Sequence, residues 1–299
     1  MSAAAEWQEL HFTARKDQVE PLEDWLFARG ALSVTLEDKA DQPLLEPGPG
    51  ETPLWDAVRL TALFAGAEDL TPLLREIPSE LCTQAPTVAV PVADREWTRV
   101  WEDQFHPLQM GSRLWICPSW THPPNPDAII VWLDPGLAFG TGTHPTTAMC
   151  LRALDGDLSP GQRVVDYGCG SGILAIAAAR LGATAVLGVD NDPQAIKASR
   201  NNAQRNEVPD AAFPVVLPQD DLVASWQASA DWVVANILAG PLVALAPALT
   251  SLMVPGGRLL LAGLLVEQAQ EVIEVYAPGV VLSIADQQEE WVLLAGEKC

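Results

Sequence analysis

A glycine-rich turn between a short β-branched strand and an apolar helix constrains the fold of this chain more than any other stretch. Residues 164–172 read VVDYGCGSG, and the alanine-rich segment 173–179 follows them directly. Glycines at alternate positions allow the backbone to turn sharply and to approach a ligand closely. Asp190 ends the next apolar run, 22 residues after Gly168, where an α/β nucleotide site places a carboxylate against ribose hydroxyls. The stretch therefore predicts a strand–turn–helix unit that binds a ligand containing ribose.

The glycine spacing narrows the kind of ligand. A dinucleotide-binding turn reads G-x-G-x-x-G, whereas this turn reads G-x-G-x-G, with Asp166 two residues before the first glycine. This spacing disfavours an NAD-dependent oxidoreductase and resembles motif I of the Rossmann-like S-adenosylmethionine-dependent methyltransferases. A tight strand-to-helix turn without any ligand is the alternative interpretation. Because strand, turn, helix and acidic strand end occur in the expected order, ligand binding is favoured.

Charge and cysteine content restrict the partners. The chain of 299 residues carries a formal net charge of −22. Such a surface repels a phosphate backbone and attracts a basic macromolecule, although solubility alone explains it equally well. We therefore expect no sequence-specific nucleic-acid binding. The five cysteines are scattered without a C-x-x-C pair, which indicates reduced thiols in the cytoplasm and no metal site. The pattern at the start and the short apolar runs predict neither a signal peptide nor a membrane partner.

The order of elements predicts two domains joined by a helix. Residues 1–93 alternate as β-α-β-β-α-β, the split, ferredoxin-like pattern, and carry no catalytic signature. The expected elements lie at 5–13, 17–29, 31–37, 58–65, 68–77 and 86–92. This domain is itself acidic, with 16 acidic and 6 basic residues. Residues 94–106 follow as a linker helix whose aromatic side chains share one face.

Residues 107–299 form the second predicted domain, in which strands alternate with helices. The expected strands lie at 114–117, 129–133, 164–167, 185–189, 213–217, 231–236 and 258–264. A closing pair is expected at 280–285 and 290–294, and helices are expected from 148, 173, 193 and 267. This order predicts a parallel sheet with an antiparallel pair at its edge.

The segment from Asp134 to Thr147 is the second unusual stretch. It contains three glycines and four threonines, and it lacks the lysine of a P-loop. Its backbone N–H and hydroxyl groups are candidate ligand donors. His144 within it is the nearest candidate for a general base, and a structural or solvated histidine is the favoured alternative. In that case a proton released during catalysis is expected to pass to water.

Six segments together resemble the PrmA family, whose members methylate large-subunit ribosomal protein eleven. They are 105–107, 114–120, 134–147, 164–172, 190–195 and 235–241. The resemblance implies an α/β fold: a Rossmann-like class I methyltransferase domain with a seven-stranded, mostly parallel sheet, preceded by a small α+β ferredoxin-like domain for substrate recognition. It also implies that S-adenosylmethionine is the methyl donor. The implied acceptors are lysine side chains and the N-terminal amine of this basic ribosomal protein, free or on the ribosome.

The resemblance assigns cofactor-binding roles to Thr147, Gly168, Asp190 and Asn236. Thr147 offers a hydroxyl to the methionine portion, Gly168 lets the backbone approach it, and Asp190 accepts from the ribose hydroxyls. Asn236 is also the candidate catalytic residue, because a carbonyl oxygen at the end of a strand can orient an incoming amine. The alternative for Asn236 is a turn residue that satisfies local backbone groups.

Two further features bear on the substrate. Asp220 or Asp221 is a candidate for the adenine amino group, or else a solvated loop acid. After Asn236 the chain reads Ile-Leu-Ala, where enzymes that methylate amino groups of nucleic-acid bases often carry Pro-Pro-Tyr/Phe. The missing platform for a flat base favours a flexible aliphatic amine. A methyltransferase of the same fold acting on RNA or a small molecule, and a non-catalytic cofactor-binding module in ribosome assembly, remain alternatives.

Overall fold

The computed structural model describes residues 7–40, 54–66, 70–84, 91–92, 105–123, 125, 127–134, 142 and 144–299. The chain divides into two compact units, residues 1–101 and 102–299. This division falls inside the range expected for the linker helix, of which residues 94–104 lie outside the described residues. Most of the stretch rich in glycine and threonine, residues 135–141 and 143, also lies outside them.

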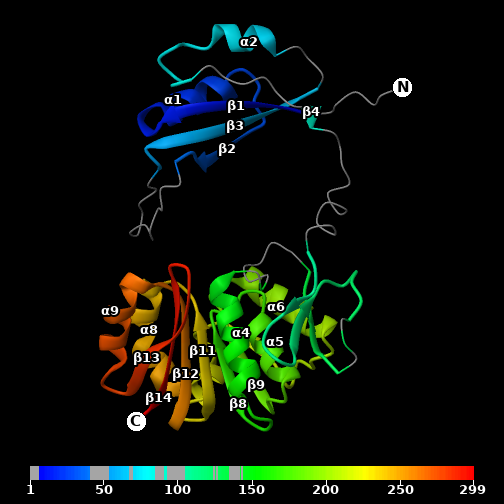
Figure 1. Cartoon of the computed structure of the whole chain (residues 1–299), viewed down its shortest axis with the longest axis vertical. Helices are drawn as coiled ribbons and strands as arrows, with labels where there is room; N and C mark the ends of the chain where they lie inside the picture. The colour runs from blue at the N-terminus through cyan, green and yellow to red at the C-terminus, as the bar shows by residue number, and fades with distance from the viewer. Residues whose placement is uncertain are drawn as a thin grey trace. The chain divides into compact units, whose positions relative to one another are not determined.

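The smaller unit is a four-stranded antiparallel sheet with two helices on one face (Figure 1). Its elements are β1 (Trp7–Arg15), α1 (Lys16–Phe27), β2 (Ser33–Asp38), β3 (Ala57–Ala65), α2 (Thr71–Glu76) and β4 (Pro91–Val92). Apolar residues alternate along β1 and β3, so Leu10, Phe12 and Leu60 are buried together with Leu22 and Leu26 of α1. The strand order β2-β3-β1-β4 is the predicted ferredoxin-like arrangement.

The larger unit is built on a seven-stranded sheet of order β10-β9-β8-β11-β12-β14-β13. Its strands are β8 (Arg163–Tyr167), β9 (Ala185–Val189), β10 (Val215–Val216), β11 (Ala230–Asn236), β12 (Met253–Leu265), β13 (Val280–Gln288) and β14 (Trp291–Lys298). The first five are parallel, and β14 runs antiparallel to both β12 and β13. The predicted mostly parallel sheet with an antiparallel edge is therefore confirmed.

Helices cover both faces of this sheet (Figure 1). They are α4 (Pro145–Asp157), α5 (Ile173–Arg180), α6 (Pro193–Arg205), α7 (Asp221–Ser225), α8 (Ala239–Leu252) and α9 (Ala269–Tyr276), with a short 3₁₀ turn, η1 (Val266–Gln268), before α9. One apolar core contains α4 and α5, and the other contains α8 and α9, as a layered α/β domain requires. None of the helices in the described ranges is long and apolar enough to cross a membrane.

A separate sheet of three strands, β5 (Leu108–Gln109), β6 (Leu114–Cys117) and β7 (Ile129–Trp132), packs against α5 through β7. Asp155 of α4 holds the turn between β5 and β6, because its Oδ2 accepts from the backbone N–H groups of Ser112 at 2.6 Å and Arg113 at 3.2 Å. Since β6 and β7 are parallel, the residues that follow them, Ser119 and Asp134, lie at the same end of this sheet.

Several predicted boundaries are wrong: the helix expected from 148 begins at Pro145, and the strand expected at 290–294 extends from Trp291 to Lys298. Three more have identifiable reasons. Strand β10 has two residues instead of five, because Pro214 has no amide hydrogen to donate to the ladder. Strand β12 begins at Met253 instead of residue 258, since a bulge between the pairs Ala230–Met253 and Trp232–Arg258 lets the residues before 258 join the strand. The helix expected from residue 267 begins at Ala269 after the 3₁₀ turn. The predicted elements keep their order, and β5 and α7 are additions that were not predicted.

Candidate active site

The glycine turn joins β8 to α5 and has the backbone that its sequence predicts. Gly168 has φ +78° and Gly172 has φ +78°, in the left-handed region that favours glycine. A Cβ atom on Gly168 would overlap the side chain of Ile237, and one on Gly172 would lie 2.9 Å from Ser199 Oγ. Both positions therefore require glycine, because the backbone is in the left-handed region and because neighbouring side chains leave no room for a Cβ atom.

Asp190 lies directly after β9 and faces this turn. Its carboxylate is 9% exposed. Oδ2 accepts from the backbone N–H of Gly170 at 2.8 Å, and Oδ1 accepts from that of Asp192 at 2.9 Å. Each carboxylate oxygen can accept more than one hydrogen bond, so both can still receive a ligand hydroxyl. The structure thus gives the predicted ribose acceptor an additional role, which is to hold the glycine turn.

Thr147 and Asn236 lie side by side, although 89 positions separate them in the sequence. Thr147 is the third residue of α4 and is 2% exposed, and Asn236 is the last residue of β11. The amide Nδ2 of Asn236 donates a hydrogen bond to Thr147 Oγ1 at 3.1 Å. This contact orients the amide so that its carbonyl oxygen, Oδ1, remains available as an acceptor; no described residue donates to it.

The other candidates have local structural contacts. His144 is the N-cap of α4: its Nδ1 lies 2.8 Å from Thr146 Oγ1, and the ring packs edge-on against Trp291 with centroids 4.9 Å apart. Asp220 caps α7 by accepting from the backbone of Leu222 at 2.9 Å and is exposed, and Asp221 is the first residue of that helix. These contacts agree with the structural interpretation of His144 and give Asp220 a helix-capping role.

Helix α6 braces the glycine turn, a role that the sequence analysis missed. Ser199 Oγ donates to the carbonyl oxygen of Gly170 at 2.9 Å, and Asn202 Nδ2 donates to that of Ser171 at 2.8 Å. Polar residues at 199, 202 and 206 recur at spacings that share one helix face, which is the signal that could have revealed this contact.

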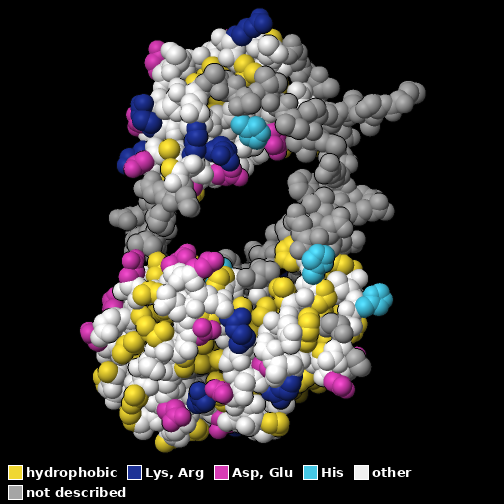
Figure 2. All heavy atoms as spheres, viewed as in Figure 1, with side chains coloured by type: hydrophobic (Ala, Val, Ile, Leu, Met, Phe, Trp, Pro, Cys, Tyr) yellow, Lys and Arg dark blue, Asp and Glu magenta, His cyan; other side chains and the backbone are white. Residues whose placement is uncertain are grey.

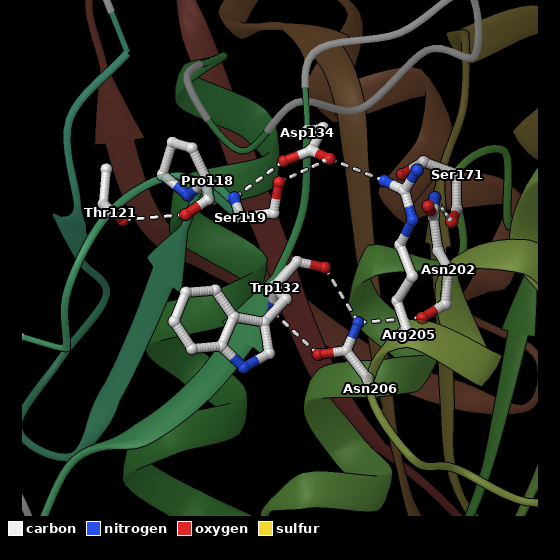
Figure 3. Close-up of polar contacts among 9 residues, drawn as sticks. All are labelled: Pro118, Ser119, Thr121, Trp132, Asp134, Ser171, Asn202, Arg205 and Asn206. Carbon is white, nitrogen blue, oxygen red and sulfur yellow. Dashed lines mark hydrogen bonds and ion pairs between the residues drawn. The ribbon is translucent and has the colours of Figure 1, made fainter. Parts of the chain in front are cut away.

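The same helix reaches β7 (Figure 3). Asn206 accepts from the backbone N–H of Trp132 at 2.7 Å and donates to its carbonyl at 2.8 Å. Arg205 Nη1 donates to Asp134 Oδ2 at 2.7 Å, and Asp134 also accepts from the backbone and hydroxyl of Ser119. A pocket of about 300 Å³ is lined by Ser119, Trp132, Asp134 and Arg205. It contains none of the four predicted site residues.

Asp166 is the most unusual titratable group near the turn. It lies within β8, two residues before Gly168, and is 1% exposed. Burial raises its pKa to about 7; a hydrogen bond from the backbone of Ala175 opposes this rise, and the charge of Asp190 adds to it. Oδ2 accepts that bond at 3.0 Å, whereas the buried Oδ1 has no partner within the described parts of the chain. Asp166 is therefore largely protonated below neutral pH.

Comparison with known proteins identifies the family to which the chain belongs. The family model for ribosomal protein L11 methyltransferase (PrmA) matches residues 6–299. The ribosomal protein L11 methyltransferases of Marinobacter nauticus and Pseudomonas aeruginosa are each 50% identical to this chain, over 297 and 293 residues, with 98% of both chains covered in each pair. A ribosomal protein L11 methylase structure from Lactobacillus delbrueckii subsp. bulgaricus matches with a TM-score of 0.57 and 32% identity, over 65% of this chain and 99% of that chain. The chain therefore belongs to the ribosomal protein L11 methyltransferase (PrmA) family, a family of S-adenosylmethionine-dependent methyltransferases.

Proposed function

We propose that this chain transfers methyl groups from S-adenosylmethionine to lysine side-chain amines and the N-terminal amine of ribosomal protein L11 in the cytoplasm. The relatives that share half of its residues carry that name. The observation that carries the proposal is the contact between Thr147 and Asn236, next to a glycine turn that Asp190 holds. It brings together a candidate donor for the cofactor, in the first turn of α4, and a candidate acceptor for an amine, at the carboxyl end of β11.

The residues present fit the proposed cofactor. Gly168 carries no side chain, so a ligand can approach its backbone closely on the side that Ile237 does not cover. Asp190 presents a nearly buried carboxylate to ribose hydroxyls, and Thr147, whose oxygen already accepts from Asn236, keeps its own hydroxyl hydrogen for the methionine portion. When bound, S-adenosylmethionine supplies an electrophilic methyl group on a sulfonium. The charged acceptor at Asp190 and the neutral donor at Thr147 suit the two ends of that molecule.

Asn236 is the residue proposed to position the amine. Its Oδ1 accepts one N–H of the acceptor, and this hydrogen bond directs the nitrogen lone pair for an in-line displacement. The nitrogen gains a bond to the methyl carbon as the methyl–sulfur bond breaks. Deprotonating a lysine at pH 7 costs about 4–5 kcal/mol, against about 1 kcal/mol for an α-amine. The Nδ1 of His144 contacts Thr146 at the start of α4, in keeping with a structural role for this histidine. The proposed acceptor of the proton is water.

Charge favours a basic protein as the partner. The net charge is −22, and Figure 2 shows acidic side chains gathered over the end of the β13–β14 hairpin. Glu289 and Glu290 form the exposed tip of this hairpin, and the carbonyl of Glu290 accepts from the backbone of Val266 at 2.9 Å, next to the exposed Glu267. This tip lies at the carboxyl edge of the sheet, where Asn236 also lies. Residues 1–93 are proposed to recognise the substrate.

A methyl-transfer assay tests this function. Purified chain, labelled S-adenosylmethionine and ribosomal protein L11, supplied free or on ribosomes, should give labelled lysine and N-terminal residues by mass spectrometry. The exposed Asp127→Asn variant is a matched control for the Asn236→Ala variant, and it should retain full transfer. Label that enters ribosomal RNA instead of the protein, or no label in either, would refute the proposal.

A further inference from the structure

Asn236, the last residue of β11, and the two residues that follow it point their side chains in different directions. Asn236 faces α4, where it contacts Thr147. Ile237 lies over the glycine turn, where its side chain occupies the space that a Cβ on Gly168 would need. Leu238, the N-cap of α8, makes no such contact and is 52% exposed. An apolar side chain is thus left open two positions from the residue proposed to hold the amine.

This exposure is unusual for its position. Eight large apolar side chains of the described residues are exposed, and three of them belong to the smaller unit. Of the others, Val275 lies on α9, while Val281 and Ile284 lie on β13, away from the hairpin tip. Leu238 and Val266 are the two that follow the carboxyl ends of the neighbouring parallel strands β11 and β12. Two of the five exposed large apolar side chains described in the larger unit, Leu238 and Val266, therefore lie at the edge of the sheet that carries the candidate site.

We propose that Leu238 is a specificity-determining contact that binds the aliphatic stem of an acceptor lysine while Asn236 holds its amine. The inference rests on the proposed function and deepens it. Consecutive Cα atoms are 3.8 Å apart, so the Cα atoms of residues 236 and 238 are separated by at most about 7 Å. An extended lysine side chain spans about 6 Å from Cα to nitrogen. The separation of these two positions is thus similar to the length of a lysine side chain. A lysine whose amine binds Asn236 can therefore contact Leu238 with its methylene groups.

The chemistry explains why an apolar residue is useful here. Methylenes are attracted to an exposed leucine because both surfaces leave water on contact. The same contact removes water from the amine, which favours its neutral, reactive form. An N-terminal α-amine has no four-methylene stem and gains little from Leu238. The contact therefore favours lysine over the N-terminal amine as the methyl acceptor. It also offsets the higher free-energy cost of deprotonating lysine.

The test compares both amines of one substrate. Transfer to ribosomal protein L11 is followed by mass spectrometry at substrate concentrations below KM, separately for lysine and for the N-terminal amine. Leu238→Ala should lower kcat/KM for lysine five- to tenfold and change that for the N-terminal amine less than twofold. Leu238→Met, which conserves size, should restore the lysine rate to within twofold. Ile284→Ala removes a side chain of similar exposure, 48%, on β13 and should leave both rates unchanged.

Calorimetric titration with S-adenosylmethionine shows whether the variants are folded, and each should bind within twofold of the wild type. An equal loss at both amines, or no loss at either, in a Leu238→Ala variant that binds the cofactor normally would overturn the inference and leave the proposed function intact. Wild-type protein that labels neither amine would overturn the proposed function and the inference with it.

Discussion

Replacing Asp166 with asparagine should change how the stability of the larger unit depends on pH. Asp166 is buried in β8, and its carboxyl has a pKa of about 7 because it is removed from water. In the unfolded chain the same carboxyl has its ordinary value of 3.8. The folded state therefore keeps a proton on Asp166 at pH values at which the unfolded state has lost it.

The size and sign of the effect follow from this difference. The stabilisation is complete below about pH 4 and is lost as pH rises through about 7, because the folded pKa is the higher one. The loss amounts to at most about 4 kcal/mol, at about 1.4 kcal/mol for each pH unit. Asparagine cannot ionise, so the variant lacks this loss. The free energy of unfolding of Asp166→Asn relative to wild type should rise between pH 5 and 7 and then level off.

The assay should report on the larger unit alone, since two units can unfold separately. The urea dependence of amide hydrogen exchange in β8 and β11, measured from pH 5 to 8, does so. Asp155→Asn is the matched control, because Asp155 is also buried, at 3% exposure. Burial alone would raise the pKa of Asp155, but hydrogen bonds from Ser112 and Arg113 lower it overall. The free energy of unfolding of Asp155→Asn relative to wild type should therefore not change between pH 5 and 8. A flat difference for Asp166→Asn as well would show that Asp166 is ionised throughout and refute the reasoning.

Four further predictions concern the site and its support. Asp190→Ala should weaken S-adenosylmethionine binding at least tenfold in calorimetry, since charge-assisted hydrogen bonds contribute about 1.5–3 kcal/mol; normal affinity in the folded variant would remove the ribose assignment. Asn236→Ala should lower kcat more than cofactor affinity, and unchanged turnover would exclude it from catalysis. Asn206→Ala should destabilise the chain by about 2–4 kcal/mol in urea unfolding, because the partly buried backbone N–H and carbonyl of Trp132 both lose their bonds to Asn206; a change below about 0.5 kcal/mol would contradict this. A chain that begins at Asp94 should bind the cofactor but not methylate intact ribosomal protein, and full activity would argue against recognition by residues 1–93.

The fold was largely predictable because each signal for it is local. The strand, turn and helix from Val164 to Arg180 follow from a β-branched run, glycines at alternate positions and an alanine-rich segment. The start of α6 follows from Asp192 and Pro193, and Asp192 Oδ1 accepts from the backbone of Gln194 at 2.8 Å as an N-cap should. In the smaller unit, the periodicity of apolar residues likewise predicted the order of strands and helices along the chain.

The missing parts depend on contacts between distant residues. No local pattern shows that Asn206 hydrogen-bonds to the backbone of Trp132, 74 positions away. Nor does one show that Asp190 accepts a hydrogen bond from the backbone of Gly170. The exposure of Leu238 also depends on tertiary packing, because the same Ile-Leu pair in another setting would be buried together. Two of the boundaries that were wrong are those of β10 and β12, where a proline and a bulge change the ladder without changing the hydrophobic pattern.

The two halves of the site differ in how much of their geometry the chain itself fixes. On the cofactor side, Asp190 and Ser199 both bind Gly170, so the turn is held from β9 and from α6. On the acceptor side, one contact with Thr147 orients Asn236; among the described residues none donates to its Oδ1, and the side chain of Leu238 is exposed. Methyl transfer requires alignment more than proton transfer, so a fixed donor can serve acceptors of different shape. This division explains how one site could accept both a lysine and an N-terminal amine, and it places their discrimination on the open side.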